Sequence, residues 1–250
     1  MLADVRSIPV GDVEEQDLDV FYEELVKELN NRTYHALLIA DEDYPSQDVP
    51  DLNQPSQDVT LLESTLTGHY SFKAENVHKL INPSRSDIIE RLDKLSEELG
   101  QNDNLLIFYA GHGVWDEDLE QGYWLPSNAR MTSKSSWISN GTIRDYVRGI
   151  NTQHTLLIAD ACFSGGIFKD RSAQLEGRAL VELYRMPSRK AMTSGTLTTV
   201  PDKSVFVKYL VKNLENNTDP VISADEIFYN LKIAVINNSP NNQVPQYGVV

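Results

Sequence analysis

The chain has 250 residues, a mass of 28.2 kDa and 40% hydrophobic residues, which is enough to bury the core of one or two domains. Its formal charge of −15 argues against binding to nucleic acid, which favours basic surfaces. The sequence has no apolar run of about 18 residues, so we expect no membrane span. The acidic stretch from Met1 to Asp19 is unlike a secretory signal, and a single cysteine allows no intrachain disulfide. We therefore expect a cytoplasmic location.

Residues 1–32 are predicted to form an N-terminal helical prelude. Its helix extends from Val13 to Leu29 and places four apolar residues at helical spacing among acids: Leu18, Phe21, Leu25 and Leu29. The prelude is a candidate docking segment for a partner protein.

From Thr33 onward, strand-like and helix-like segments alternate. The predicted strands are Tyr34–Ala40, Val77–Leu80, Leu105–Ala110, Thr155–Ala161, Lys190–Ser194 and Val244–Val250. Helices are predicted to begin after Ser84, which forms a capping box with Asp87, after Ser204, and after Ser223, which forms a capping box with Glu226. The segments 41–55, 115–140 and 166–189 are predicted to be flexible. The pattern predicts an α/β fold over residues 33–250, a three-layer α/β/α sandwich with a mostly parallel six-stranded sheet.

Two of the strands end in a reactive residue beside glycine. His112 lies between Gly111 and Gly113 after one strand, and Cys162 follows another strand, 50 residues later. Because parallel sheets build their sites at the carboxyl ends of strands, we expect the imidazole and the thiol to share one crevice. An imidazole partner lowers the pKa of a thiol and makes it a nucleophile. The alternatives are a buried, inert cysteine and a histidine that merely occupies a turn.

The string Asp160-Ala161-Cys162, with His112 upstream, resembles the caspase-like clan of cysteine peptidases. It is most similar to the bacterial orthocaspases and the metacaspases, which carry Asp where caspases carry Gln. The resemblance extends from Thr33 to the C-terminus. It implies that Cys162 is the nucleophile and His112 the general acid/base. It also implies an oxyanion hole formed by the backbone N–H groups of Gly113 and Cys162.

Asp160 is predicted to determine specificity. Strand alternation places it on the same side as Cys162, where its carboxylate would pair with Arg, and less well with Lys. The resemblance implies a second pocket acid at Asp202, while Asp41 and Asp43 are less direct candidates. Simple solvation is the alternative for these last three acids. Ser194 is expected to form a pocket wall.

Metacaspases often need calcium. Acidic residues are available at 116–118, Glu120 and Asp170, but the sequence has no EF-hand pattern and we expect no cofactor. The remaining histidines, His35, His69, His78 and His154, show no metal-type spacing.

These features predict a cysteine endopeptidase that cuts protein or peptide substrates after Arg, and less readily after Lys. Its activity would be regulated by proteolytic processing or by a partner, such as a component of a defence system. The resemblance also implies cleavage between the cysteine string and the fifth strand, where six basic residues, the last of them the first residue of that strand, are candidate cleavage sites: Lys169, Arg171, Arg178, Arg185, Arg189 and Lys190. One alternative is a catalytically silent adaptor with the same fold. A nucleotide- or flavin-binding domain is disfavoured, because the sequence has no glycine-rich phosphate loop.

Overall fold

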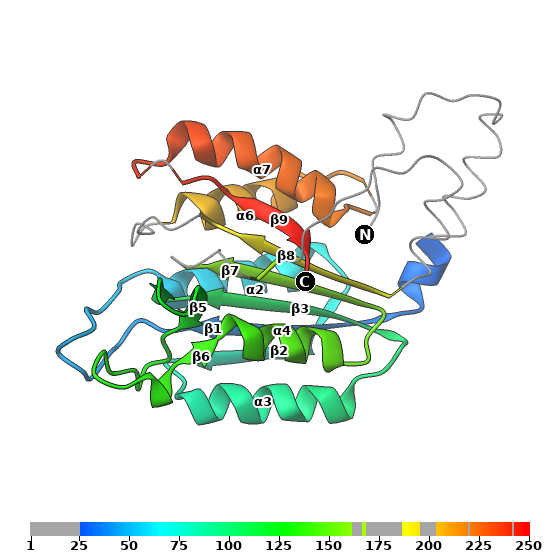
Figure 1. The fold of residues 1–250 in the computed structure, drawn as a ribbon. Coiled ribbons are helices and arrows are strands. Elements are labelled where there is room, and N and C mark those ends of the chain that lie inside the picture. The colour runs from blue at the N-terminus through cyan, green and yellow to red at the C-terminus, as the bar shows by residue number, and fades with distance from the viewer. Residues whose placement is uncertain (1–25, 162–166, 169–186, 196–203, 220, 242) are drawn as a thin grey trace.

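The computed structural model describes residues 26–161, 167–168, 187–195, 204–219, 221–241 and 243–250. Within them, the main sheet has six strands in the order β2-β1-β3-β7-β8-β9, and every neighbouring pair is parallel except β8 and β9 (Figure 1). Its strands are β1 (Thr33–Ala40), β2 (Phe72–Ile81), β3 (Asp103–Ala110), β7 (His154–Asp160), β8 (Ser188–Thr193) and β9 (Gln246–Val249). Each predicted strand corresponds to one of these six.

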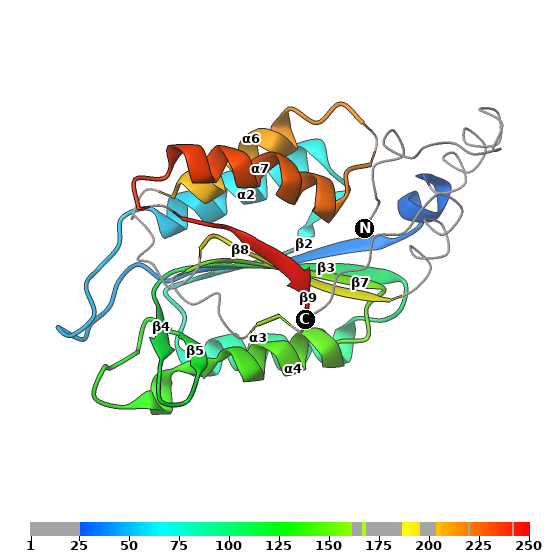
Figure 2. The same ribbon diagram turned by 45° about the horizontal axis from the view of Figure 1, so that its top comes forward.

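Helices cover both faces of the sheet, as the alternating sequence predicts (Figure 2). One face is covered by α2 (Pro55–His69), α6 (Val205–Glu215) and α7 (Ala224–Asn238). The other face is covered by α3 (Arg85–Glu98) and α4 (Asn140–Gly149). The three-layer α/β/α fold is therefore confirmed.

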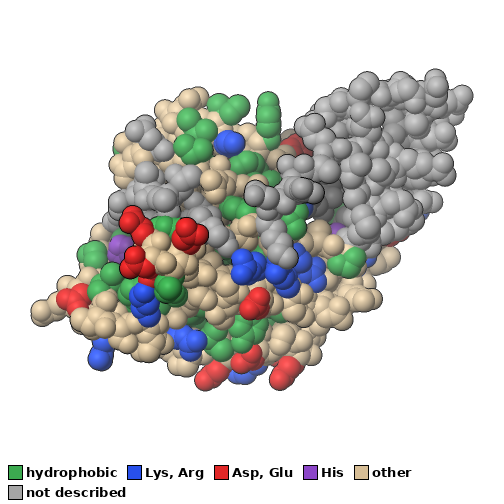
Figure 3. Space-filling view, viewed as in Figure 1, with side chains coloured by type: hydrophobic (Ala, Val, Ile, Leu, Met, Phe, Trp, Pro, Cys, Tyr) green, Lys and Arg blue, Asp and Glu red, His purple; other side chains and the backbone are tan. Residues whose placement is uncertain are grey.

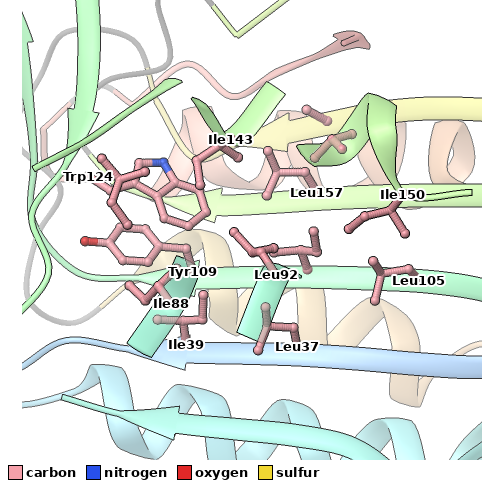
Figure 4. Close-up of a cluster of buried hydrophobic side chains, with 14 of the residues drawn as sticks. Leu37, Ile39, Ile88, Leu92, Leu105, Tyr109, Trp124, Ile143, Ile150 and Leu157 are labelled. Carbon is pink, nitrogen blue, oxygen red and sulfur yellow. The ribbon is translucent and has the colours of Figure 1, made fainter. Parts of the chain in front are cut away.

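The central strands are apolar along their length because they are buried on both faces. In β1, Leu37 and Ile39 pack toward α3 and α4, whereas Leu38 packs toward α2 and α6. Figure 4 shows the first of these cores, in which Leu92 lies beside the strand residues. Burial on two faces fixes the register of β3 between β1 and β7, and thereby the relative positions of the strand ends.

Three helices begin at the predicted serines. The Ser84 side chain accepts the N–H of Asp87, and the Asp87 carboxylate accepts the N–H of Ser84, which completes the capping box. Ser204 and Ser223 likewise cap α6 and α7 through the N–H groups of Val207 and Glu226. These local hydrogen bonds satisfy N–H groups that have no partner within the helix.

Two further helices and a second sheet were not predicted. The helices are α2 and α4. The small sheet consists of β4 (Gly113–Asp116), β5 (Gln121–Trp124) and β6 (Ile138–Ser139). The prediction of a flexible segment from 115 to 140 is therefore wrong in large part. Its strands have only two to four residues, which is too short for an alternation pattern to show in the sequence.

The segment 166–189, predicted to be flexible, ends earlier than expected, because β8 begins at Ser188 and so includes Arg189 as well as Lys190. The Arg189 guanidinium donates to four carbonyl oxygens, those of Ile150, Thr152, Gln153 and Ser188. A strand residue held in this way is a poor protease substrate, so we withdraw Arg189 and Lys190 as cleavage sites. The other four basic residues lie outside the described residues, as does most of the prelude; of it, residues 26–32 are described, and 26–30 are helical.

Among the described ranges of the chain, no helix is both long enough and apolar enough to cross a membrane.

Candidate active site

The carboxyl ends of β3 and β7 lie side by side. Ala110, the last residue of β3, pairs in parallel with Asp160, the last residue of β7. His112 follows β3 by two residues, and Cys162 follows β7 by two residues in the sequence. The structure thus brings His112 and Asp160 to the same edge of the sheet. Cys162 and Asp202 lie outside the described residues, so their placement stays a prediction.

The imidazole of His112 is held by a backbone carbonyl. Its Nε2 lies 2.8 Å from the carbonyl oxygen of Pro50, which comes from the loop between β1 and α2. A carbonyl oxygen can only accept, so Nε2 must carry the hydrogen. In the neutral ring, Nδ1 is then the nitrogen that can take a proton.

Pro50 is a residue that the sequence analysis missed. Its contribution is a main-chain oxygen, which every residue type has, so no side-chain pattern could have identified it. The loop that carries Pro50 lies within the segment 41–55, which was predicted to be flexible. Two hydrogen bonds join residues before the proline to residues after it. The N–H of Tyr44 donates to Asp51 Oδ1 at 2.7 Å, and the N–H of Leu52 donates to the carbonyl of Glu42 at 2.9 Å.

Two glycines flank His112 for different reasons. A Cβ at Gly111 would lie 2.8 Å from the Tyr109 hydroxyl, so only glycine lets the chain pass this close to that side chain. Gly113 begins β4 and pairs with Trp124 of β5. Its role as an oxyanion donor stays a prediction, because that role concerns a substrate.

Asp160 is a buried carboxylic acid with 5% of its surface exposed. Burial raises the pKa of Asp160, and the neighbouring hydroxyls of Ser194 and Ser204 lower this pKa in part. Within the described part of the chain, its Oδ1 has no hydrogen-bond partner. An unpaired carboxyl oxygen in such a position can bind a donor-rich cation. Ser204, which caps α6, was missed in this second role; Ser194 was expected at the pocket wall.

Asp41 and Asp43 differ from each other. Asp41 is fully buried at the end of β1, and its Oδ1 accepts the N–H of Ser127 at 2.9 Å. Burial raises the pKa of Asp41 well above its usual range. Asp43 is exposed and accepts a hydrogen bond from the Asn82 side chain. Both acids thus bind groups of the loops that surround the sheet edge.

The acidic segment after β4 does not fit a calcium site. The Asp116 carboxylate is paired with Lys134 and also accepts the N–H of Leu119. Across the described residues, no three His, Cys, Asp or Glu side chains gather as a metal site requires. Asp170 lies outside those residues.

Of the other four histidines, three lie away from this edge of the sheet: His35, His69 and His154. His35 and His154, at the amino-terminal ends of β1 and β7, contact Asp103 and Ser188. Burial lowers the pKa of both His35 and His78. His69 is exposed at the end of α2.

Most of the chain matches a known protein family. The caspase domain family matches residues 33–249. The chain belongs to the caspase domain family. Metacaspase-6 of Arabidopsis thaliana is 28% identical over 131 residues, which are 47% of this chain and 35% of that protein. The match thus spans about a third of the length of this curated relative.

Solved structures show the same fold. Caspase-1 of Spodoptera frugiperda has a TM-score of 0.61 at 14% identity, over 88% of this chain and 87% of the other. A protein of Geobacter sulfurreducens has a TM-score of 0.59 at 13% identity, over 86% of this chain and 92% of the other. The caspase fold expected from the resemblance is therefore confirmed.

Proposed function

We propose that this caspase-family protein is a cysteine endopeptidase that cleaves after Arg, and less readily after Lys, with Cys162 as nucleophile and His112 as general acid/base. The observation that carries the proposal is the imidazole at the end of β3. Its Nε2–H is bound to Pro50, and β3 pairs with the strand that leads to Cys162. This arrangement leaves Nδ1 to exchange a proton with a thiol.

The reaction then proceeds in two halves. The Cys162 thiol gives its proton to His112 Nδ1, and the thiolate attacks the carbonyl carbon of the scissile bond. The protonated imidazole returns the proton to the departing amine, which leaves an acyl-enzyme. Water attacks the thioester while His112 takes its proton; the C–S bond breaks, His112 returns the proton to the departing thiolate, the product acid is released and the free thiol is regenerated. The Pro50 carbonyl stabilises the imidazolium by accepting from Nε2–H throughout.

Specificity for a basic residue is proposed to come from Asp160. A guanidinium would supply the donors that its Oδ1 lacks among the described residues, in a region where water is largely excluded. Acidic side chains also gather, beside a histidine, at the left of the molecular surface in Figure 3, where the parallel strands end. Such a field attracts a basic peptide segment.

The dyad is tested with purified Cys162→Ala and His112→Ala on an arginyl peptide reporter. Each variant should lose about 1000-fold or more in kcat. His69→Ala is the matched control, because His69 is exposed and lies at the opposite end of the fold. Thermal unfolding of all variants verifies that they are folded. Full activity of either dyad variant would refute the assignment.

The same assay separates the peptidase from a silent adaptor. A wild-type protein that cleaves neither arginyl nor lysyl reporters would speak for the adaptor. So would a failure of Cys162 to react with a peptidyl-arginine electrophile.

A further inference from the structure

Two buried tyrosines hold the main chain at His112. The Tyr44 hydroxyl accepts the backbone N–H of His112 at 3.1 Å. The Tyr109 hydroxyl donates to the backbone carbonyl oxygen of His112 at 2.7 Å. Tyr44 is 6% exposed and Tyr109 is fully buried, so solvent does not readily replace either hydroxyl.

Both hydroxyls are fixed by further backbone groups. The Tyr44 hydroxyl lies 3.2 Å from the carbonyl oxygens of Asp41 and Leu125, and the Tyr109 hydroxyl lies 3.2 Å from that of Leu125. The Tyr109 ring stacks on Trp124, with centroids 4.1 Å apart (Figure 4). The turn at His112 is thereby tied to the end of β1 and to the chain that follows β5.

Tyr44 also contacts the imidazole itself. The two ring centroids are 5.1 Å apart, at an angle of 47°. The same residue anchors the loop of Pro50 through its N–H, which donates to Asp51. One side chain therefore contacts the backbone and the ring of His112, and its own main chain braces the loop whose carbonyl binds Nε2.

We propose that Tyr44 and Tyr109 are positioning residues for the peptidase reaction: they orient His112 so that Nδ1 meets the Cys162 thiol. This inference rests on the proposed function. Because a shift of about 1 Å at a reacting group can cost about 100-fold in rate, loss of one hydroxyl lowers kcat by about 10- to 100-fold. The KM changes by less than about twofold, since the tyrosines act through His112.

The test compares Tyr44→Phe and Tyr109→Phe with Tyr70→Phe. Tyr70 also donates its hydroxyl to a carbonyl, that of Leu214 at 2.8 Å, but it follows α2 near the amino-terminal edge of the sheet. The first readout is kcat and KM on an arginyl reporter. The second is the pH profile of Cys162 alkylation by iodoacetamide, which depends on the imidazole and not on peptide turnover.

We expect the alkylation pH profiles of Tyr44→Phe and Tyr109→Phe to shift toward that of His112→Ala. Tyr70→Phe should keep the wild-type alkylation profile at a comparable loss of thermal stability. In the double variant Tyr44→Phe/His112→Ala, the tyrosine substitution adds no further change. If both tyrosine variants match Tyr70→Phe in kcat and in the alkylation profile, the inference is wrong.

The two proposals fail in different ways. An inert wild type that cleaves no basic reporter would overturn the proposed function. The alkylation profiles would still decide whether the tyrosines orient His112 toward the thiol, with His112→Ala as the reference. If His112→Ala itself leaves the alkylation profile unchanged, no imidazole–thiol contact exists and the positioning inference is overturned as well.

Discussion

Replacing Asp160 by Asn should separate the recognition of charge from the chemistry of the reaction. The substitution keeps the shape of a side chain that is 5% exposed and removes its negative charge. Removing one partner of a buried ion pair typically costs about 3–5 kcal/mol, or about two to four decades in an equilibrium or rate constant. The loss of kcat/KM on an arginyl substrate should not exceed this range.

The structure argues for the lower end of that range. Burial raises the pKa of Asp160, so part of the pairing free energy is consumed in ionising the carboxyl. We therefore expect kcat/KM on an arginyl reporter to fall by about 100-fold in Asp160→Asn.

A citrullinyl reporter provides the matched substrate, because citrulline has nearly the shape of arginine but no charge. Its cleavage should change by less than about threefold in Asp160→Asn, since no ion pair is lost. Asp41→Asn is the matched protein control: it is also a buried aspartate at the carboxyl end of a parallel strand of the same sheet, two strands away, but its carboxylate accepts from Ser127. Equal losses on both reporters, or no loss on the arginyl one, would refute the role of Asp160.

The pH dependence offers an independent check. Asp160 carries a charge only above its raised pKa, so the ratio of arginyl to citrullinyl kcat/KM in the wild type should rise with pH through that pKa. In Asp160→Asn the ratio should not vary with pH in this way.

Two further predictions concern stability and processing. Burial raises the folded-state pKa of Asp41, so its contribution to stability is present below the unfolded value of about 3.9 and is lost as pH rises. The free energy of unfolding of Asp41→Asn relative to wild type should therefore increase from about pH 4 to pH 7 in denaturant titrations. Asp87 is the opposite control, because hydrogen bonds from Ser84 lower its pKa and its contribution is lost only as pH falls; a flat Asp41→Asn difference would contradict the reasoning. Intact-mass spectrometry should find the wild type cut only after residues between 167 and 187, and Cys162→Ala uncut. A cut after Arg189 would contradict its place in β8, and a cut in both proteins would indicate a contaminating protease. The candidate sites are Lys169, Arg171, Arg178 and Arg185.

The helices and strands that could be predicted from the sequence are those with a local signal. The strands of the main sheet were predicted because burial on two faces requires continuous apolar runs. Three helices were predicted because Ser84, Ser204 and Ser223 each cap through a side chain three residues from its partner. The glycines beside His112 and the spacing to Cys162 gave the resemblance to caspases.

Two helices had weaker local signals. In α2, Pro55 occupies the first turn and Val59, Leu62 and Leu66 are buried, but no side chain caps its start. The start of α4 is capped by Ser139, yet this helix has only ten residues. The strands of the small sheet are too short to show a period, and their pairing depends on contacts such as Gly113 with Trp124.

From the sequence alone came the class of fold, which is confirmed, and the assignment of His112 and Cys162 as reactive residues, which stays a prediction. How His112 is held depends on long-range packing, because its partners Pro50 and Tyr44 lie 62 and 68 residues away along the chain. One partner contributes a main-chain oxygen and the other a hydroxyl of a common residue type, so neither leaves a recognisable pattern. The burial of Asp160 against Ser194 and Ser204 was decided in the same way, since it depends on β8 and α6 closing over the end of β7. Such contacts arise from packing between distant segments, which local spacing does not encode.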